Sequence, residues 1–136
     1  MSEENVEIVR RIHEAVEHGD IDTVLGLYDP EIVWVFTRSP FGEFLKNDVY
    51  RGHEGLKRMF RERYDDAWRE IEDELQEVID AGARVVSVVS THGRGRASGA
   101  EVRKTHAGVW TIRDGRVVRV EWMSREEALE AAGLSE

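Results

Sequence analysis

The chain has 136 residues, 40% hydrophobic and 35% charged, which suits one globular domain over residues 1–136 with its own core. A formal net charge of −9 argues against general nucleic-acid binding, which needs basic surface, and the lack of cysteine excludes disulfides and thiolate chemistry. Because no apolar run approaches the roughly 20 residues of a membrane span and the N-terminus has no signal-peptide pattern, we expect a cytoplasmic protein with no membrane partner.

The N-terminal quarter predicts two helices and a strand. Apolar residues recur at helical spacing over 6–16, and Gly19 is a good terminator. Asp20 can cap a second, short helix whose buried side ends with Tyr28. Residues 32–36 are β-branched or aromatic and therefore predict a strand.

The middle of the chain predicts a long loop, a third helix and two strands. Loops as long as residues 37–51 are usually functional or mobile, so a lid is one interpretation of this segment. Residues 70–79 alternate like a strand, although they could also prolong the preceding helix, and residues 83–91 are apolar on both faces, as in a central strand. Residues 52–55 lead into the third helix, whose buried face is predicted to carry Leu56, Met59, Phe60, Tyr64, Ala67 and Trp68.

Residues 102–123 predict a hairpin around Asp114-Gly115. A two-residue loop would pair Ile112 with Val117, whereas a three-residue loop with Gly115 in a bulge shifts the pairing by one. The hydrophobic pattern favours the bulged loop, because a slip of one residue turns every side chain to the other face. One face then carries Val102, His106, Gly108, Trp110, Ile112, Val118, Val120 and Trp122.

The opposite face of this hairpin is too apolar for a wet surface and too polar for a core. A second subunit or a partly covered sheet face would suit this mixture, and we expect a homodimer through this outer face of the sheet. A capping box at Ser124 and Glu127 predicts a short C-terminal helix, and helices segregated from a run of antiparallel strands indicate an α+β fold. The outer face is predicted to carry Arg103, Thr105, Val109, Thr111, Val117, Arg119, Glu121 and Met123.

The order and spacing of four segments resemble those of a known protein family. The segments are HGDIDTVLGLYDPEIVW, YRGHEGLKRMF, VIDAGARVV and VWTIRDGRVVRVEW. From about Val6 to Trp122 the chain resembles the SnoaL-like branch of the nuclear-transport-factor-2-like superfamily, which includes the ketosteroid isomerases. The resemblance implies a cone-like, strongly curved, mostly antiparallel sheet packed on the N-terminal helices and enclosing an apolar pocket, often in a dimer. The superfamily contains isomerases, epoxide hydrolases, dehydratases, polyketide cyclases and proteins that only bind, so the fold alone does not give the function.

Two of these chemistries are disfavoured at the matching positions. The base, the tyrosine and the protonated acid of a ketosteroid isomerase would fall on Phe36, Ile12 and Gly108, none of which can transfer a proton. An epoxide hydrolase needs an acid–arginine–acid arrangement, and the inward positions of the last strands carry no carboxylate. Glu121 and Arg119 are predicted on the outer face as a surface pair.

A histidine-centred site remains. His106 points inward in the preferred register, and His92 has the same alternation as Val88 and Ser90, which we assign inward. Two imidazoles in one apolar cavity could divide the roles of acid and base. No metal site or cofactor is predicted, because no inward carboxylate completes a zinc site and residues 93–96 do not lead into a phosphate-binding helix. The predicted ligand-binding wall consists of Tyr28, Trp34, Phe36, Phe60, Tyr64, Val88, Ser90, Trp110, Val120 and Trp122.

Three functions stay open at this point. The first is a protein that binds a small apolar or aromatic molecule, with or without catalysis. The second is a lyase or isomerase acting on a cyclic or polyketide-like carbonyl compound, with His106 as acid or base. The third is a protein-interaction module that uses the outer sheet face.

Overall fold

The computed structural model describes residues 2–42, 45–63 and 68–134. Its strands form one six-stranded sheet in the order β2-β1-β6-β5-β4-β3, in which β1 and β6 are parallel and the other described neighbours antiparallel. The α+β prediction is confirmed. The elements are α1 (Ser2–Glu17), α2 (Ile21–Leu27), β1 (Tyr28–Val35), β2 (Val49–Arg51), α3 (Gly52–Arg61), β3 (Trp68–Ala81), β4 (Arg84–Gly95), β5 (Glu101–Arg113), β6 (Arg116–Met123) and α4 (Arg125–Ala131).

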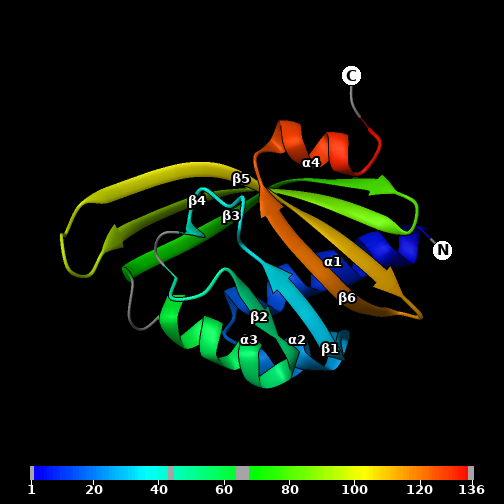
Figure 1. The fold of residues 1–136 in the computed structure, drawn as a ribbon, viewed down its shortest axis with the longest axis horizontal. Coiled ribbons are helices and arrows are strands. Elements are labelled where there is room, and N and C mark those ends of the chain that lie inside the picture. Colours follow the sequence, from blue (N-terminus) through cyan, green and yellow to red (C-terminus); the bar gives the residue numbers. More distant parts are fainter. Residues whose placement is uncertain (1, 43–44, 64–67, 135–136) are drawn as a thin grey trace.

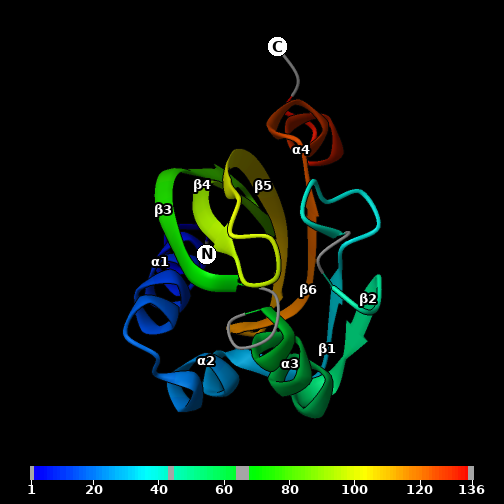
Figure 2. The same ribbon diagram turned by 90° about the vertical axis from the view of Figure 1, so that its left-hand side faces the viewer.

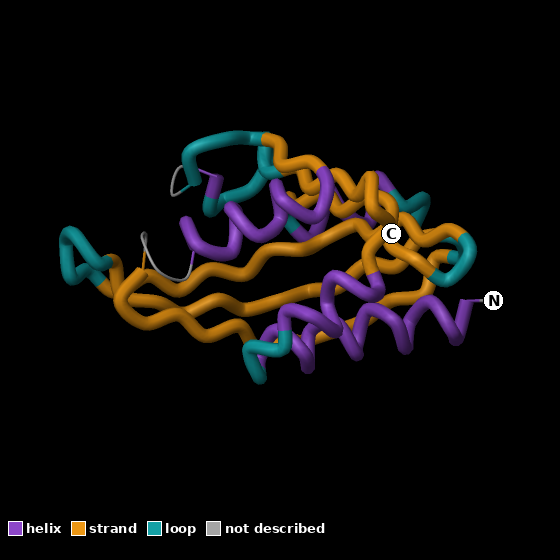
Figure 3. Tube along the Cα trace, turned by 90° about the horizontal axis from the view of Figure 1, so that it is seen from below, coloured by secondary structure: helices purple, strands orange, loops and turns teal. Residues whose placement is uncertain are grey.

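The sheet has helices on both faces. Helices α1, α2 and α3 pack on the face that we call inner, and α4 packs on the outer face (Figure 1). In Figure 2, β3 and β2 lie at opposite edges of the sheet, with α2 and α3 below. In Figure 3, α1 starts at the N label and runs along the long strands. The larger of two apolar cores therefore lies between the inner face and the first three helices.

The β5–β6 hairpin combines features of both predicted registers. Its loop has two residues, with Asp114 and Gly115 both at positive φ, and Ile112 pairs with Val117. One step further on, a register shift leaves Val118 unpaired, so that Trp110 pairs with Val120, as the bulged loop predicted. The inward positions of His106, Trp110, Val120 and Trp122 are thus correct, whereas Val117 is the inward residue and Val118 is not.

The predicted alternation of β4 is wrong. Val85 and Val89 belong to the inner core, and Ser87 and Thr91 bond to side chains there. Val86 and Val88 pack instead on the outer face, so Ser90 and His92, which alternate with them, do not face inward. The alternation could not be predicted because both sets of alternating side chains in this buried strand are mostly apolar.

The segment between α3 and β4 also differs from its prediction. Trp68 begins β3 instead of continuing the third helix, and Tyr64 and Ala67 lie outside the described residues. The strand interpretation of residues 70–79 is correct, but a register shift after Leu75 turns Ile79 to the outer core.

Two loop assignments change as well. Tyr28 begins β1 and does not end α2, although its side chain is buried as expected. The predicted loop 37–51 contains β2, which pairs with β1. Whether this loop acts as a lid stays a prediction.

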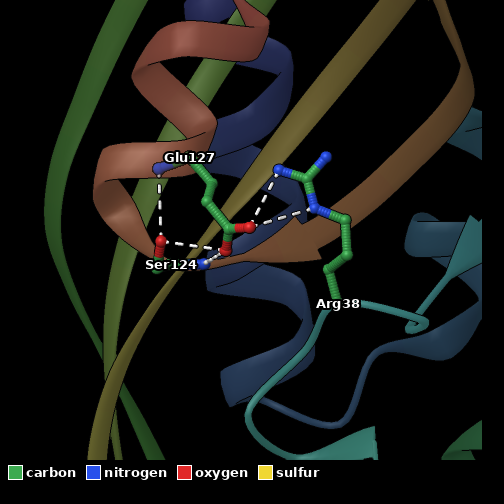
Figure 4. A network of polar contacts seen from close by, with 3 residues as sticks. All are labelled: Arg38, Ser124 and Glu127. Atoms are coloured by element: carbon green, nitrogen blue, oxygen red, sulfur yellow. Dashed lines mark hydrogen bonds and ion pairs between the residues drawn. The ribbon is translucent and has the colours of Figure 1, made fainter.

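Helix α4 covers part of the outer face. Ser124 and Glu127 form the predicted capping box, and the second oxygen of the Glu127 carboxylate accepts a hydrogen bond of 3.2 Å from Arg38 Nε (Figure 4). Ala128 packs with Val109 and Met123 in the outer core. The apolar residues that suggested a second copy on this face are therefore covered by the chain's own helix. Among the described residues, every helix is too short or too polar to cross a membrane.

Candidate functional site

The inner core contains a cluster of large aromatic side chains contributed by three strands and one helix. The Trp34 ring centre lies 5.7 Å from that of Trp122 and 6.1 Å from that of Trp110. Trp34 meets Trp110 edge to face, with 81° between the ring planes, and is tilted by 50° against Trp122. Aromatic pairs of this kind stabilise the core in addition to burying area. We call this group the aromatic cluster; it consists of Tyr28, Trp34, Phe60, Trp110 and Trp122.

Gly108 makes room for two of these indoles. A Cβ atom at this position would lie 2.9 Å from Trp110 Nε1 and 3.0 Å from the Trp122 ring. The backbone of β5 therefore forms the floor on which both rings lie. The position where a ketosteroid isomerase would place an acid serves here to pack aromatic rings.

A chain of polar side chains borders the aromatic cluster and ends at His106. Arg63, which follows α3, donates to Asp73 Oδ1 on β3 at 2.9 Å. The same oxygen accepts a 2.6 Å bond from the Thr91 hydroxyl on β4, and Thr91 Oγ1 lies 2.9 Å from His106 Nε2 on β5. We call this set of four residues the polar chain.

The direction of these hydrogen bonds fixes the tautomer of His106. Burial raises the pKa of Asp73, but Arg63 and the Thr91 hydroxyl outweigh this and the net pKa is lowered, so Asp73 is ionised and only accepts. Thr91 has one hydrogen and gives it to Asp73, so His106 Nε2 must donate to Thr91. Burial, assisted by Arg63 and opposed by Asp73, lowers the pKa of His106 to about 3. At neutral pH His106 is therefore uncharged, with its proton on Nε2 and a lone pair on Nδ1.

A second histidine reaches the site from α1. His13 Nε2 lies 3.3 Å from Ser87 Oγ, which accepts a 2.8 Å bond from Trp110 Nε1. Burial lowers the pKa of His13 to about 4, although Asp73 acts in the opposite direction. The second inward histidine is thus His13 and not His92.

Three buried polar atoms around the aromatic cluster have no hydrogen-bond partner among the described residues. They are the indole N–H groups of Trp34 and Trp122, which can only donate, and His106 Nδ1, which can only accept in this tautomer. Buried polar atoms are normally paired, so three exceptions close together make this cluster the candidate functional site.

The free space in the cluster is small. The centre of a water molecule can occupy only about 20 Å³ there, which is room for about one water. A wider groove between α1 and β3 has three lining residues, His13, Val16 and Asp73, in common with the small cavity of the cluster. We therefore regard this groove as the approach to the cluster.

The predicted site residues divide into four groups. His106, Tyr28, Trp34, Phe60, Trp110 and Trp122 line the cavity of the aromatic cluster. Phe36 and Val120 pack in the same inner core without lining it. Val88, Ser90 and His92 are on the outer side of β4, and Tyr64 lies outside the described residues.

Sequence reasoning missed Arg63, Asp73, Ser87 and Thr91. Asp73 could have been found, because it has the same alternation as Ile71 and Leu75. The predicted lack of an inward carboxylate is therefore wrong, because Asp73 of β3 lines the cavity. Within the described part of the chain, no three histidine, aspartate or glutamate side chains lie close enough together to hold a metal ion.

Comparison with protein families gives one decisive match. Residues 9–120 match the family described as "SnoaL-like domain". The chain belongs to this family. No curated protein matches the chain.

Many solved structures match this fold, and the three described next are distant in sequence. One is TerC co-crystallised with polyporic acid, with 22% identity, a TM-score of 0.77, and 95% of this chain and 97% of that chain covered. A nuclear-transport-factor-2-like protein of unknown function from Burkholderia pseudomallei has 21% identity, a TM-score of 0.77 and coverage of 96% of both chains. A protein described as a putative SnoaL-like polyketide cyclase from Mesorhizobium loti has 16% identity, a TM-score of 0.67, and coverage of 85% and 95%. At these identities the similarity shows a shared fold.

Proposed function

We propose that this protein, a single SnoaL-like domain, binds a small apolar or aromatic molecule within the aromatic cluster. The observation that carries the proposal is the set of three unpartnered polar atoms, the N–H groups of Trp34 and Trp122 and the lone pair of His106 Nδ1, in an otherwise apolar environment. Ligand sites have this composition: mostly apolar and aromatic walls with a few polar groups that fix orientation.

The small free volume sets a condition on binding. A ligand larger than a water molecule has to displace side chains of the cluster, so binding includes a rearrangement of the site. TerC, which has the same fold, was co-crystallised with polyporic acid, and this supports a small-molecule ligand for the present chain.

Tryptophan fluorescence tests the proposal. Three of the four tryptophans belong to the cluster, so a ligand that enters it should quench the emission in a saturable way and raise the melting temperature. His106→Leu should weaken binding at least about fivefold through the loss of one hydrogen bond. His92→Leu is the matched control on the outer side of β4. Equal affinities of the two variants, or no saturable quenching by any aromatic compound tested, would contradict the proposal.

Lyase or isomerase chemistry on a cyclic or polyketide-like carbonyl compound is the second candidate, favoured by the polar chain. A neutral imidazole, held by Thr91 and backed by the Asp73 carboxylate, resembles the arrangement by which enzymes orient a general base. In this candidate, His106 Nδ1 takes a proton from a carbon next to the carbonyl group, the C–H electron pair moves into an enolate, and the imidazolium then returns the proton to another carbon (isomerase) or to the leaving group (lyase). Turnover of a compound panel by the parent protein and its loss in His106→Ala would support catalysis, and turnover that survives in His106→Ala would exclude His106 as the base.

A homodimer through the outer face is a separate proposal. It rests on the strand positions that α4 leaves exposed, among them Arg103 and Thr105 on β5. Because α4 covers Val109 and Met123, the proposed contact is limited to the strand positions beyond this helix. Light scattering tests it: a monomeric mass at all concentrations would contradict the dimer.

A further inference from the structure

The direction of the polar chain determines which ligand group His106 can meet. Because Nε2 donates to Thr91, the only free function of the imidazole is the lone pair on Nδ1, which needs a donor. The nearby indole of Trp122, with its ring centre 4.8 Å from that of His106, offers an N–H and needs an acceptor. A hydroxyl group is the simplest group that donates and accepts at once, whereas a ketone, an ether or a carboxylate only accepts.

We propose that the ligand of the aromatic cluster is a neutral molecule with a phenol-type or enol-type hydroxyl, which donates its hydrogen bond to His106 Nδ1. This inference rests on the proposed binding function and adds the chemical class of the ligand. Thr91 acts in it as a positioning residue, because it holds the imidazole in the accepting tautomer.

The charged side chains along the groove between α1 and β3 favour a neutral ligand over an anionic one. Its wall carries Glu7, Glu14 and Glu17 from α1 and Glu72 from β3, against a single described arginine, Arg10. A carboxylate that approaches the cluster along this groove meets like charge, which disfavours its entry. At the end of the groove Asp73 is ionised, and its pairing with Arg63 leaves no net positive charge to attract an anion.

The test uses three probes with one ring system: 2-naphthol, its methyl ether and 2-naphthoate. We expect the parent protein to bind naphthol about tenfold more tightly than the ether, the effect of one buried hydrogen bond, and to bind naphthoate most weakly. A ¹H–¹⁵N long-range correlation spectrum of the free protein should show His106 protonated at Nε2. This measurement needs neither a ligand nor a variant.

Two variants then separate positioning from general effects. Thr91→Val removes the hydroxyl that holds the tautomer, so the preference for naphthol over its ether should fall to about twofold. Thr105→Val makes the same change on the exposed side of β5 and should leave the preference unchanged. A preserved preference in Thr91→Val would overturn the role of Thr91.

The remaining outcomes distinguish this inference from the function on which it rests. Binding of the ether or of naphthoate as tightly as naphthol, or a proton on Nδ1 in the free protein, would overturn the hydroxyl inference and leave small-molecule binding in place. Failure of all three probes to bind would count against both.

Discussion

The two faces of the sheet bury side chains of different kinds, although the same strands supply both. The outer core consists of aliphatic residues and methionine from β4, β5, β6 and α4. The inner core buries the three indoles of the aromatic cluster, and the polar side chains of Ser87, Thr91 and His106 are buried on the same face. The outer core shows that these strands can be packed without buried polar groups. Since burying polar groups requires a full set of partners, their concentration on the inner face is best explained by function.

The ion pairs show the same contrast. Arg63 and Asp73 are 12% and 20% exposed, whereas Arg125 and Glu77, which join α4 to β3, are 42% and 45% exposed. The first pair is shielded from water and the second is not. Removal of one partner therefore leaves a poorly hydrated charge in the first case and a well hydrated charge in the second.

The largest expected effect comes from breaking the inner pair. Asp73→Asn should lower the free energy of unfolding by about 3 kcal/mol, because Arg63 then keeps its charge without its carboxylate. Glu77→Gln, the matched change in the exposed pair, should lower it by less than about 1 kcal/mol. Urea unfolding of both variants measures the difference, and losses of equal size would show that the two faces do not differ in this respect.

The next effect depends on pH and on His106. Its folded-state pKa, about 3, lies below the unfolded value near 6.5, so between these values the unfolded chain binds more protons than the folded one. Stability should therefore fall as the pH decreases from about 6.5 towards 3, and His13, with a pKa of about 4, acts in the same direction.

His106→Gln should reduce this loss. Between pH 7 and pH 5 one such histidine removes about 2 kcal/mol of stability, so the variant should lose about that much less than the parent protein over the same interval. His92→Gln is the control on the outer side and should retain the parent's pH dependence. Thermal unfolding at a series of pH values measures how stability depends on pH. Parallel curves of stability against pH for the parent and His106→Gln would contradict a buried neutral imidazole.

Local signals were enough to predict the order of the elements other than β2. The Asp20 cap, the Ser124–Glu127 capping box and the Asp114-Gly115 turn each involve residues close in sequence, and all three are present. β2 was missed because three residues beside a long loop carry no alternation that could be recognised.

Which side chains of a strand face inward was harder to predict, for two physical reasons. In β4 both phases contain valine and one or more hydroxyl residues, so the pattern 85–91 cannot select between Ser87 and Ser90 as the inward serine. In β3 and β6 a register shift changes the phase within one strand, after Leu75 and at Val118. A two-residue alternation read along the sequence does not reveal such a shift.

The aromatic half of the candidate site was therefore predicted better than its polar half. His106, Trp110 and Trp122 lie on a hairpin whose phase the large side chains determine. Asp73 and Thr91 meet His106 only through the pairing of three strands, and Arg63 reaches them from beyond the end of α3. Such tertiary contacts depend on registers that no single segment encodes.

The smallest expected effect concerns Gly108, where the aromatic cluster meets the backbone. Gly108→Ala places a methyl group 2.9–3.1 Å from the two indoles, so the rings have to shift and the free energy of unfolding should fall by about 1.5 kcal/mol. Gly26→Ala is the control: this glycine lies in helix α2 with no atom within 4 Å of its added Cβ, so stability should rise by about 0.5 kcal/mol through helix propensity. Urea unfolding with tryptophan emission as the signal measures both, and a stabilising Gly108→Ala would mean that the indoles do not pack on β5. Because the displaced rings border His106, the variant should also bind an aromatic ligand differently from the parent, which Gly26→Ala should not.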